Sequence, residues 1–76
     1  MIILTKNGCK NCLKVKQYLD SKNIDYEVIN LSNKERRKER KHYRDSGYEL
    51  LPVIEDGDWV MEGCNLELLE EYINDR

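Results

Sequence analysis

Long hydrophobic stretches are absent from this 76-residue sequence. No apolar run approaches the roughly 18 residues that a membrane-spanning helix needs. The apolar run at residues 1–4 has no basic segment before it and is too short for the core of a secretory signal peptide. Internal repeats and low-complexity linkers are also absent. These absences exclude membrane proteins and repeat arrays, and we expect a cytoplasmic protein with a single domain over residues 1–76.

Cysteine is scarce and odd in number, with only three residues, at positions 9, 12 and 64. An odd count leaves one thiol without a partner, and the cytosol keeps thiols reduced. A scaffold held together by disulfides is therefore disfavoured. Cysteines that react or that bind a metal are expected instead.

The net charge is only −2, but it is unevenly distributed. Seven Lys or Arg residues and two Glu residues lie between positions 34 and 44, so this segment carries +5 and the remainder carries −7. Such a segment could bind nucleic acid or an acidic partner. Because Tyr43 is its only aromatic residue and the whole chain is acidic, nucleic acid is disfavoured and a solvated helix is favoured.

The hydrophobic pattern predicts seven elements. We expect strands over residues 1–5, 24–31, 50–55 and 58–62, and helices over residues 9–22, from residue 32 or 33 to residue 45, and after residue 65. Ser32 or Asn33 could cap the second helix and Asn65 the third, while Asp56-Gly57 suits a tight hairpin turn. The order β-α-β-α-β-β-α predicts an α/β, thioredoxin-like fold, with a four-stranded mixed sheet flanked by helices.

The spacing of apolar residues also assigns an apolar face to the first and last helices and to the second strand. In the first helix this face holds Cys12, Val15, Tyr18 and Leu19. In the last helix it holds Leu66, Leu68, Leu69, Tyr72 and Ile73. In the second strand the alternating apolar residues are Ile24, Tyr26 and Val28.

The segment Cys9-Lys10-Asn11-Cys12 follows a predicted buried strand and begins a predicted helix. The free N–H groups and positive dipole end of a helix stabilise an anion there, and Lys6 and Lys10 add cations beside it. Because such surroundings lower a thiol pKa below the free value of about 8.5, we expect Cys9 to be the catalytic nucleophile. Cys12 lies one turn further on the inward face, and we expect it to be the resolving thiol.

A two-residue gap between cysteines also occurs in zinc sites, which normally need four ligands. Only Cys64 and His42 could complete such a set, and both lie far along the chain without a partner at ligand spacing. The redox pair is therefore favoured, and no metal ligand is predicted. No carboxylate is placed beside His42 by the sequence, so we do not expect His42 to act as a general base.

With the cysteine pair placed, the chain resembles the glutaredoxin family over nearly its whole length. Residues 4–12 are similar to the strand end, threonine-lysine pair, glycine and CxxC segment of that family. Residues 46–53 are similar to its serine-glycine and Thr-Val-Pro segment, and residues 63–65 to its Gly-Gly-Cys-Asp turn before the last helix. The resemblance implies a thioredoxin fold with Pro52 in the cis form opposite the cysteines and the Leu51 backbone free to pair with a bound thiol peptide. An ordinary proline at the start of a strand is the alternative interpretation.

The resemblance also implies a glutathione or substrate site. Family members that use glutathione hold its glycine carboxylate with a lysine at the position of Lys6 and its γ-glutamyl end at the turn formed here by Cys64 and Asn65. The expected binding residues are Lys6, Asn11, Leu51, Pro52, Cys64 and Asn65. One of three basic residues in the middle segment is also expected to contact the glutathione carboxylate or the acidic tail of a client, namely Arg37, Arg40 or Lys41.

The sequence departs from the family pattern at several of these positions. Asn65 lacks the negative charge of the family's aspartate, which would meet the ammonium group of glutathione. Asn11 replaces an aromatic residue, Leu50 replaces a threonine, and Glu62 replaces the first glycine of the pair. Each departure weakens the case for glutathione and leaves the dithiol chemistry untouched.

The sequence therefore predicts a monomeric thiol-disulfide oxidoreductase without a bound cofactor, which reduces protein or glutathione mixed disulfides and is itself reduced by glutathione. One alternative is the branch of the family that is reduced by thioredoxin reductase and serves ribonucleotide reductase, although its Trp-Ser-Gly-Phe-Arg-Pro segment is absent. The alternative from another class is a non-catalytic module that binds zinc or acts as a basic adaptor through residues 34–44.

Overall fold

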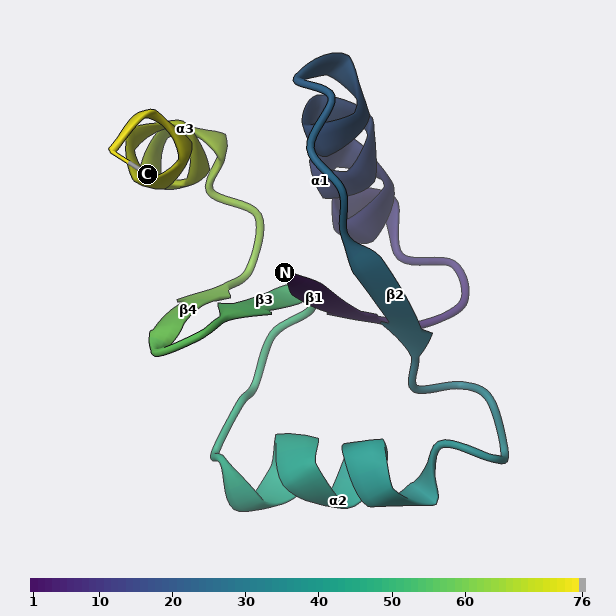
Figure 1. Ribbon diagram of the computed structural model, residues 1–76. Coiled ribbons are helices and arrows are strands. Elements are labelled where there is room, and N and C mark those ends of the chain that lie inside the picture. The colour runs from purple at the N-terminus through teal and green to yellow at the C-terminus, as the bar shows by residue number, and fades with distance from the viewer. Residues whose placement is uncertain (76) are drawn as a thin grey trace.

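A computed structural model describes residues 1–75 and shows a mixed sheet between two layers of helices (Figure 1). The elements are β1 (Ile2–Thr5), α1 (Lys10–Ser21), β2 (Glu27–Asn30), α2 (Arg37–Asp45), β3 (Val53–Asp56), β4 (Trp59–Glu62) and α3 (Leu66–Asn74). The predicted order of elements is confirmed. Among residues 1–75, no helix is long and apolar enough to cross a membrane.

The four strands lie in the order β2-β1-β3-β4. β1 runs parallel to β2 and antiparallel to β3, and β4 closes the sheet as an antiparallel hairpin with β3. α1 and α3 cover one face of the sheet and α2 covers the other (Figure 1). This is the α/β thioredoxin-like fold that the sequence predicts, and it places the end of β1 in the middle of the sheet.

Each face of the sheet has its own apolar cluster, because successive side chains of a strand point to opposite faces. Under α1 and α3 the buried residues are Ile3, Val15, Leu19, Ile54, Met61 and Leu69. Under α2 they are Leu4, Ile29, Leu31 and Val53, with Tyr43 and Tyr48 packed against them. β1 is therefore buried on both faces, and the segment that leaves it starts from a fixed point.

β2 is shorter than predicted and begins at Glu27 rather than at residue 24. Asn23 has a positive φ of 57°, which turns the chain before the strand. Ile24 and Tyr26 still pack against the core from this turn. Val28, the third of the alternating apolar residues, is 38% exposed. β2 is an edge strand, and Val28 lines a surface cavity together with residues from the exposed start of α1.

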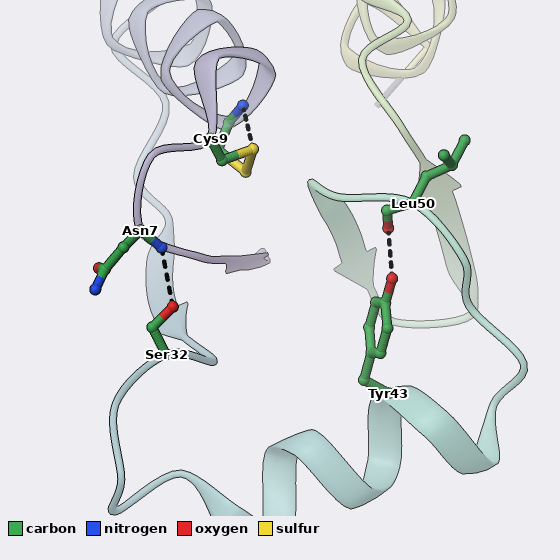
Figure 2. The surroundings of a disulfide bond; sticks show 6 residues. Asn7, Cys9, Ser32, Tyr43 and Leu50 are labelled. Atoms are coloured by element: carbon green, nitrogen blue, oxygen red, sulfur yellow. Dashed lines mark hydrogen bonds between the residues drawn. A yellow bond between two sulfur atoms is a disulfide. The ribbon is translucent and has the colours of Figure 1, made fainter.

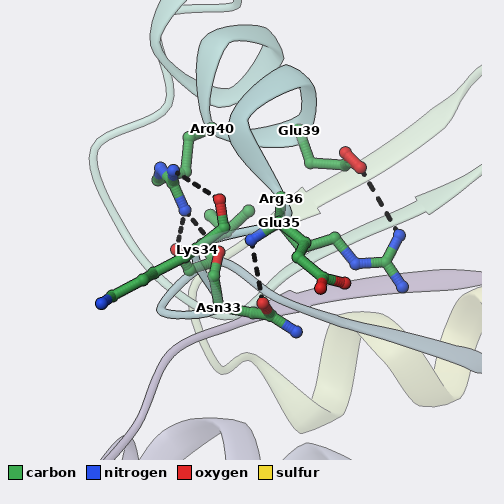
Figure 3. Close-up of polar contacts among 7 residues, drawn as sticks. Asn33, Lys34, Glu35, Arg36, Glu39 and Arg40 are labelled. Atoms are coloured by element: carbon green, nitrogen blue, oxygen red, sulfur yellow. Dashed lines mark hydrogen bonds and ion pairs between the residues drawn. The ribbon is translucent and has the colours of Figure 1, made fainter.

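α2 begins at Arg37, so the prediction of a helix from Ser32 or Asn33 is wrong. The Ser32 hydroxyl accepts the N–H of Asn7 at 3.0 Å and is not free to cap a helix (Figure 2). The Asn33 side chain accepts the N–H of Glu35 at 2.9 Å, which closes a local turn instead (Figure 3). No side chain of α2 is fully buried, in agreement with the thin apolar face of this segment.

α3 begins as predicted, since the Asn65 side chain accepts the N–H of Leu68 at 3.1 Å. Leu69 is fully buried. Leu66 and Leu68, which the sequence pattern places on the same apolar face, are 37% and 40% exposed and lie outside the core. The apolar stripe that α3 buries is therefore narrower than the sequence suggests, with Leu69 in the core cluster and Ile73 packed against it.

A polar cluster joins α2 to β3. The Glu55 carboxylate lies 2.7 Å from Nε2 of His42 and accepts the Tyr48 hydroxyl at 2.8 Å. His42 therefore has a carboxylate partner, contrary to the sequence-based expectation. Burial raises the pKa of the Glu55 carboxyl, but the hydrogen bonds from His42 and Tyr48 outweigh it, so the pKa lies below its ordinary value of 4.5.

We predict that Glu55→Gln destabilises the fold at neutral pH by about 1 kcal/mol, because the charged acceptor of two hydrogen bonds is lost. A carboxyl whose pKa is lower in the folded protein contributes stability above its unfolded pKa, and this contribution is lost as the pH falls through the folded pKa. The difference between Glu55→Gln and the natural protein should thus shrink below pH 4.5. Urea unfolding of both proteins at neutral pH and below pH 4.5 measures this difference in the free energy of unfolding.

The matched control is Glu70→Gln on the exposed side of α3, which should change the free energy of unfolding by less than about 0.5 kcal/mol. Equal losses in the two variants, or a difference that persists in acid, would contradict the assigned role of Glu55.

Candidate active site

The two cysteines of the CxxC motif lie where β1 ends and α1 begins. Gly8 has a positive φ of 72°, a conformation that glycine adopts readily, and it turns the chain from the buried strand into the helix. Cys9 is the N-cap of α1, and its sulfur accepts the N–H of Cys12 at 3.1 Å. The two cysteines form a disulfide across 5.2 Å between their Cα atoms (Figure 2).

The two sulfur atoms have different surroundings. Cys9 is half-buried, while Cys12 is only 2% exposed. The first turn of α1 contains no acidic residue that would offset the positive end of the helix dipole, and Lys6 and Lys10 lie exposed on either side of Cys9. The N–H of Cys12 and the positive end of the helix therefore face the sulfur of Cys9, and Lys6 and Lys10 line the same surface cavity as Cys9.

The loop between β1 and α1 is held against the end of β2. The N–H of Asn7 donates to Ser32, and the Asn30 side-chain amide donates to Oδ1 of Asn7 at 2.9 Å. Oδ1 of Asn30 in turn accepts the N–H of Ser32 at 2.9 Å. These three bonds fix the approach to Cys9. Two of them join segments more than 20 residues apart, which no local pattern of the sequence reports. The third closes a local turn between Asn30 and Ser32.

Two surface cavities flank this loop, and Lys6 lines both of them. The larger, of about 530 Å³, adjoins both cysteines and lies between α1 and β2. The smaller, of about 300 Å³, lies between the loop and α2, and Leu51 forms part of its wall. The structure thus brings Lys6 next to the cysteines on one side and next to Leu51 on the other.

Of the three basic residues proposed from the sequence, only Arg40 lines the smaller cavity. Its guanidinium donates to the carbonyl oxygens of Leu31 at 3.0 Å and Asn33 at 2.6 Å, so it braces the segment before α2 (Figure 3). Arg44, one turn further along α2, also lines the cavity, and within residues 1–75 its side chain is not tied to a carbonyl or carboxylate. The spacing of four residues from Arg40 is the signal that could have identified Arg44.

The Leu51–Pro52 peptide bond is cis, as the resemblance implies. The carbonyl oxygen of Pro52 accepts the N–H of Gly63 at 2.8 Å, which joins this segment to the turn before α3. Gly63 is buried with a φ of 83°, and a Cβ atom there would lie 3.3 Å from Cδ1 of Leu50. A residue larger than glycine would strain this junction.

Glu62 holds the segment that leads to Pro52. Its carboxylate accepts the N–H groups of Glu49 and of Leu50, the latter at 2.8 Å. The Tyr43 hydroxyl donates to the carbonyl oxygen of Leu50 at 3.2 Å (Figure 2). The two backbone N–H groups hold the pKa of the Glu62 carboxyl below its ordinary value of 4.5. The sequence marked Glu62 only as a departure from glycine, but the structure gives it this positioning role.

The remaining predicted residues lie in three places. Asn11 is exposed in the first turn of α1 and lines neither cavity. Cys64 is a half-buried free thiol packed against the core, beyond the Gly63 junction. The Asn65 side chain is used as the cap of α3. Within residues 1–75 no three His, Cys, Asp or Glu side chains are grouped as metal ligands would be.

Comparison with known proteins identifies the relatives of this chain. A family model described as Glutaredoxin matches residues 1–60. The chain belongs to the glutaredoxin family. It is a glutaredoxin-type thiol-disulfide oxidoreductase, with its CxxC pair at disulfide distance.

Relatives of similar sequence include two proteins named Glutaredoxin 1. The one from Rickettsia prowazekii (strain Madrid E) is 40% identical over 66 residues, which are 86% of this chain and 70% of that protein. The one from Rickettsia conorii is 33% identical over 66 residues, and the match spans 65% of its length.

Solved structures share the fold of this glutaredoxin. The glutaredoxin-like protein NrdH-redoxin from Escherichia coli has a TM-score of 0.80 at 28% identity, covering 92% of this chain and 90% of that one. A glutaredoxin from Archaeoglobus fulgidus has a TM-score of 0.77 at 32% identity, covering 95% of this chain and 83% of that one. The thioredoxin-like fold is thereby confirmed.

We predict that the amide protons of Glu49 and Leu50 report the ionisation of Glu62. Their NMR chemical shifts should follow a single titration with a pKa below 4.5, because both donate to the carboxylate. The Glu62→Gln variant provides the control, since it keeps an acceptor oxygen but cannot titrate. A midpoint above 4.5, or an unchanged titration in Glu62→Gln, would contradict the geometry.

Proposed function

We propose that this glutaredoxin reduces protein disulfides and glutathione mixed disulfides by dithiol exchange through Cys9 and Cys12, with glutathione as the reducing co-substrate. The observation that carries the proposal is the N–H of Cys12 donating to the sulfur of Cys9 at the first turn of α1. A sulfur that already accepts a backbone N–H is prepared to carry a negative charge.

In the first step the Cys9 thiolate attacks one sulfur of the client disulfide. A mixed disulfide forms between Cys9 and the client, and the other client sulfur leaves as a thiolate that takes up a proton. Cys12 then loses its proton and attacks the sulfur of Cys9, which releases the second client thiol. The client has gained two electrons, and the protein is left with the Cys9–Cys12 disulfide.

Two molecules of glutathione return the protein to its dithiol form. The first attacks the Cys9–Cys12 disulfide and forms a mixed disulfide, and the second attacks that intermediate and leaves as oxidised glutathione. The step needs no bound cofactor, because glutathione itself supplies both electrons.

The different exposure of the two sulfurs supports their separate roles. Cys9 is half-buried and faces the larger cavity, so a client sulfur has access to it. Cys12 is 2% exposed and meets an incoming disulfide only after Cys9 has bound it. The 5.2 Å between the Cα atoms lets Cys12 complete the exchange without a rearrangement of α1.

The smaller cavity suits glutathione. Lys6 and Arg44 offer two cations to its glycine carboxylate, and Leu51 presents main-chain groups beside them. The Cys64-Asn65 turn, joined to Pro52 through Gly63, offers backbone N–H groups to the γ-glutamyl end. Since the Asn65 side chain caps α3, we assign its contribution to the backbone rather than to its amide.

We predict that Cys9→Ser lowers the exchange rate by more than about a thousandfold, because a hydroxyl is not ionised at neutral pH. Cys12→Ser should still attack a disulfide peptide, but it should accumulate as a covalent adduct of one peptide per chain, visible by mass spectrometry. In that variant, the pKa of Cys9 from thiolate absorbance should lie below about 8.5.

These two variants control for each other, since each removes one sulfur from the same helix turn. An adduct that forms on Cys9→Ser rather than on Cys12→Ser would reverse the assignment. A Cys9 pKa above about 8.5 would remove the physical basis of the mechanism.

A second candidate is an electron donor reduced by thioredoxin reductase. It is favoured by the similarity to NrdH-redoxin, a glutaredoxin-like protein described as having a thioredoxin-like activity profile. In that case, ribonucleotide reductase is a candidate client. The exchange steps at Cys9 and Cys12 would be the same, and only the source of electrons would differ.

We predict that the oxidised protein is reduced by glutathione, and this is measured as NADPH consumption in the presence of glutathione and glutathione reductase. A parallel reaction contains thioredoxin reductase in place of both. Arg44→Ala should raise the KM for glutathione about threefold, because one of two carboxylate contacts is lost. Turnover with thioredoxin reductase alone would establish the second candidate, and turnover with neither would refute both.

A further inference from the structure

The larger cavity is not used by the glutathione site proposed above. It lies on the other side of Lys6, between α1 and β2, and both cysteines of the redox pair form part of its wall. Its volume of about 530 Å³ exceeds the 300 Å³ of the smaller cavity. A client segment bound in this cavity would lie next to the disulfide that Cys9 attacks.

The charge of this cavity has one sign. Lys6, Lys10 and Lys16 line it, and none of the described residues in its wall is acidic. The chain as a whole has a net charge of −2, so the cavity is a local basic area on an acidic protein. Three ammonium groups around one depression attract carboxylates and repel other cations.

The same cavity has an aliphatic surface. Leu13 of α1 is 52% exposed and Val28 of β2 is 38% exposed, and both line it. No aromatic side chain is present in its described wall, so there is no platform on which a nucleic-acid base could stack. An apolar side chain of a peptide fits these two residues better than a base does.

The rim of the cavity is fixed before anything binds. Asn7 and Asn30 line it, and their side chains are hydrogen-bonded to each other at 2.9 Å. Figure 2 shows the second bond, from the backbone N–H of Asn7 to Ser32. A rim that is already ordered loses little conformational entropy on binding. This is the property expected of a docking surface rather than of an incidental depression.

We propose that this cavity, the client groove formed by Lys6, Lys10, Leu13, Lys16 and Val28, docks an acidic client segment that carries an apolar side chain next to the reactive disulfide. The proposal rests on the proposed function and names the substrate class of the same Cys9. The exchange itself is unchanged: Cys9 bonds to one client sulfur, and the other leaves as a thiol.

The test uses two synthetic peptides with one internal disulfide each. In the first, the cysteines are flanked by Glu and Leu, and in the second, Lys replaces every Glu. Stopped-flow mixing with the reduced protein at low salt gives the exchange rate. We predict that the acidic peptide reacts about tenfold faster, and that the difference falls as salt screens the lysines.

Paired variants separate the groove from the rest of the surface. Lys16→Glu should slow the acidic peptide about fivefold, while Lys14→Glu, which changes the net charge equally from an exposed position outside the groove, should stay within about twofold. Val28→Ser should slow both Leu-containing peptides about threefold. Its control is Val60→Ser on the opposite edge strand, where the valine is 43% exposed.

Reaction with hydroxyethyl disulfide tests the proposed function separately from the client groove, because this small neutral molecule does not need the groove. The two variants outside the groove, Lys14→Glu and Val60→Ser, should react with it at the natural rate, and every peptide rate is divided by the rate with this molecule. A natural protein that fails to reduce it would refute the proposed function. Equal rates for the two peptides, equal effects of Lys14→Glu and Lys16→Glu, or displacement of the acidic peptide by a single-stranded oligonucleotide of the same charge would refute the client groove alone.

Discussion

The site depends on one bond, the N–H of Cys12 donating to the sulfur of Cys9 at 3.1 Å. An N-cap is normally an oxygen-bearing side chain, and here a sulfur takes that place. The position is defined because β1 is buried on both faces and a short loop, residues 6–9, leads from its end into the helix. A helix without a first-turn carboxylate then directs its positive end at the sulfur. The hydrogen bond that caps α1 is therefore also the one expected to stabilise a negative charge on the sulfur of Cys9.

Local signals in the sequence were sufficient for most of the fold. The Asn65 cap, the CxxC motif at the start of a helix and the closing hairpin each depend on neighbouring residues, and each was predicted. The start of α2 was not predicted, since Ser32 is engaged by Asn7 from a distant loop. A capping residue has several possible partners, and only the tertiary structure determines which one it has.

The candidate site divides in the same way. The cysteine pair could be assigned from one short segment, and the resemblance brought Lys6 and Leu51 to the same cavity. Arg44 and Glu62 were missed as site residues. Arg44 could have been identified from its spacing of four residues from Arg40 on α2. The role of Glu62 comes from what lies opposite it. Glu62 reaches back across 12 and 13 residues to two backbone N–H groups, and no periodicity of the sequence reports such a contact.

Lys6 gives the two proposed binding sites a common element, because it lines both cavities. One ammonium group cannot fully neutralise two carboxylates. A carboxylate bound in one cavity therefore weakens the attraction of Lys6 for a carboxylate in the other cavity. Each cavity also has two cations of its own, Arg40 and Arg44 on the α2 side and Lys10 and Lys16 on the α1 side. On these proposals, an acidic client and glutathione are held mainly by different residues, and Lys6 couples them. Release of the reduced client would then free Lys6 for the glutathione that follows.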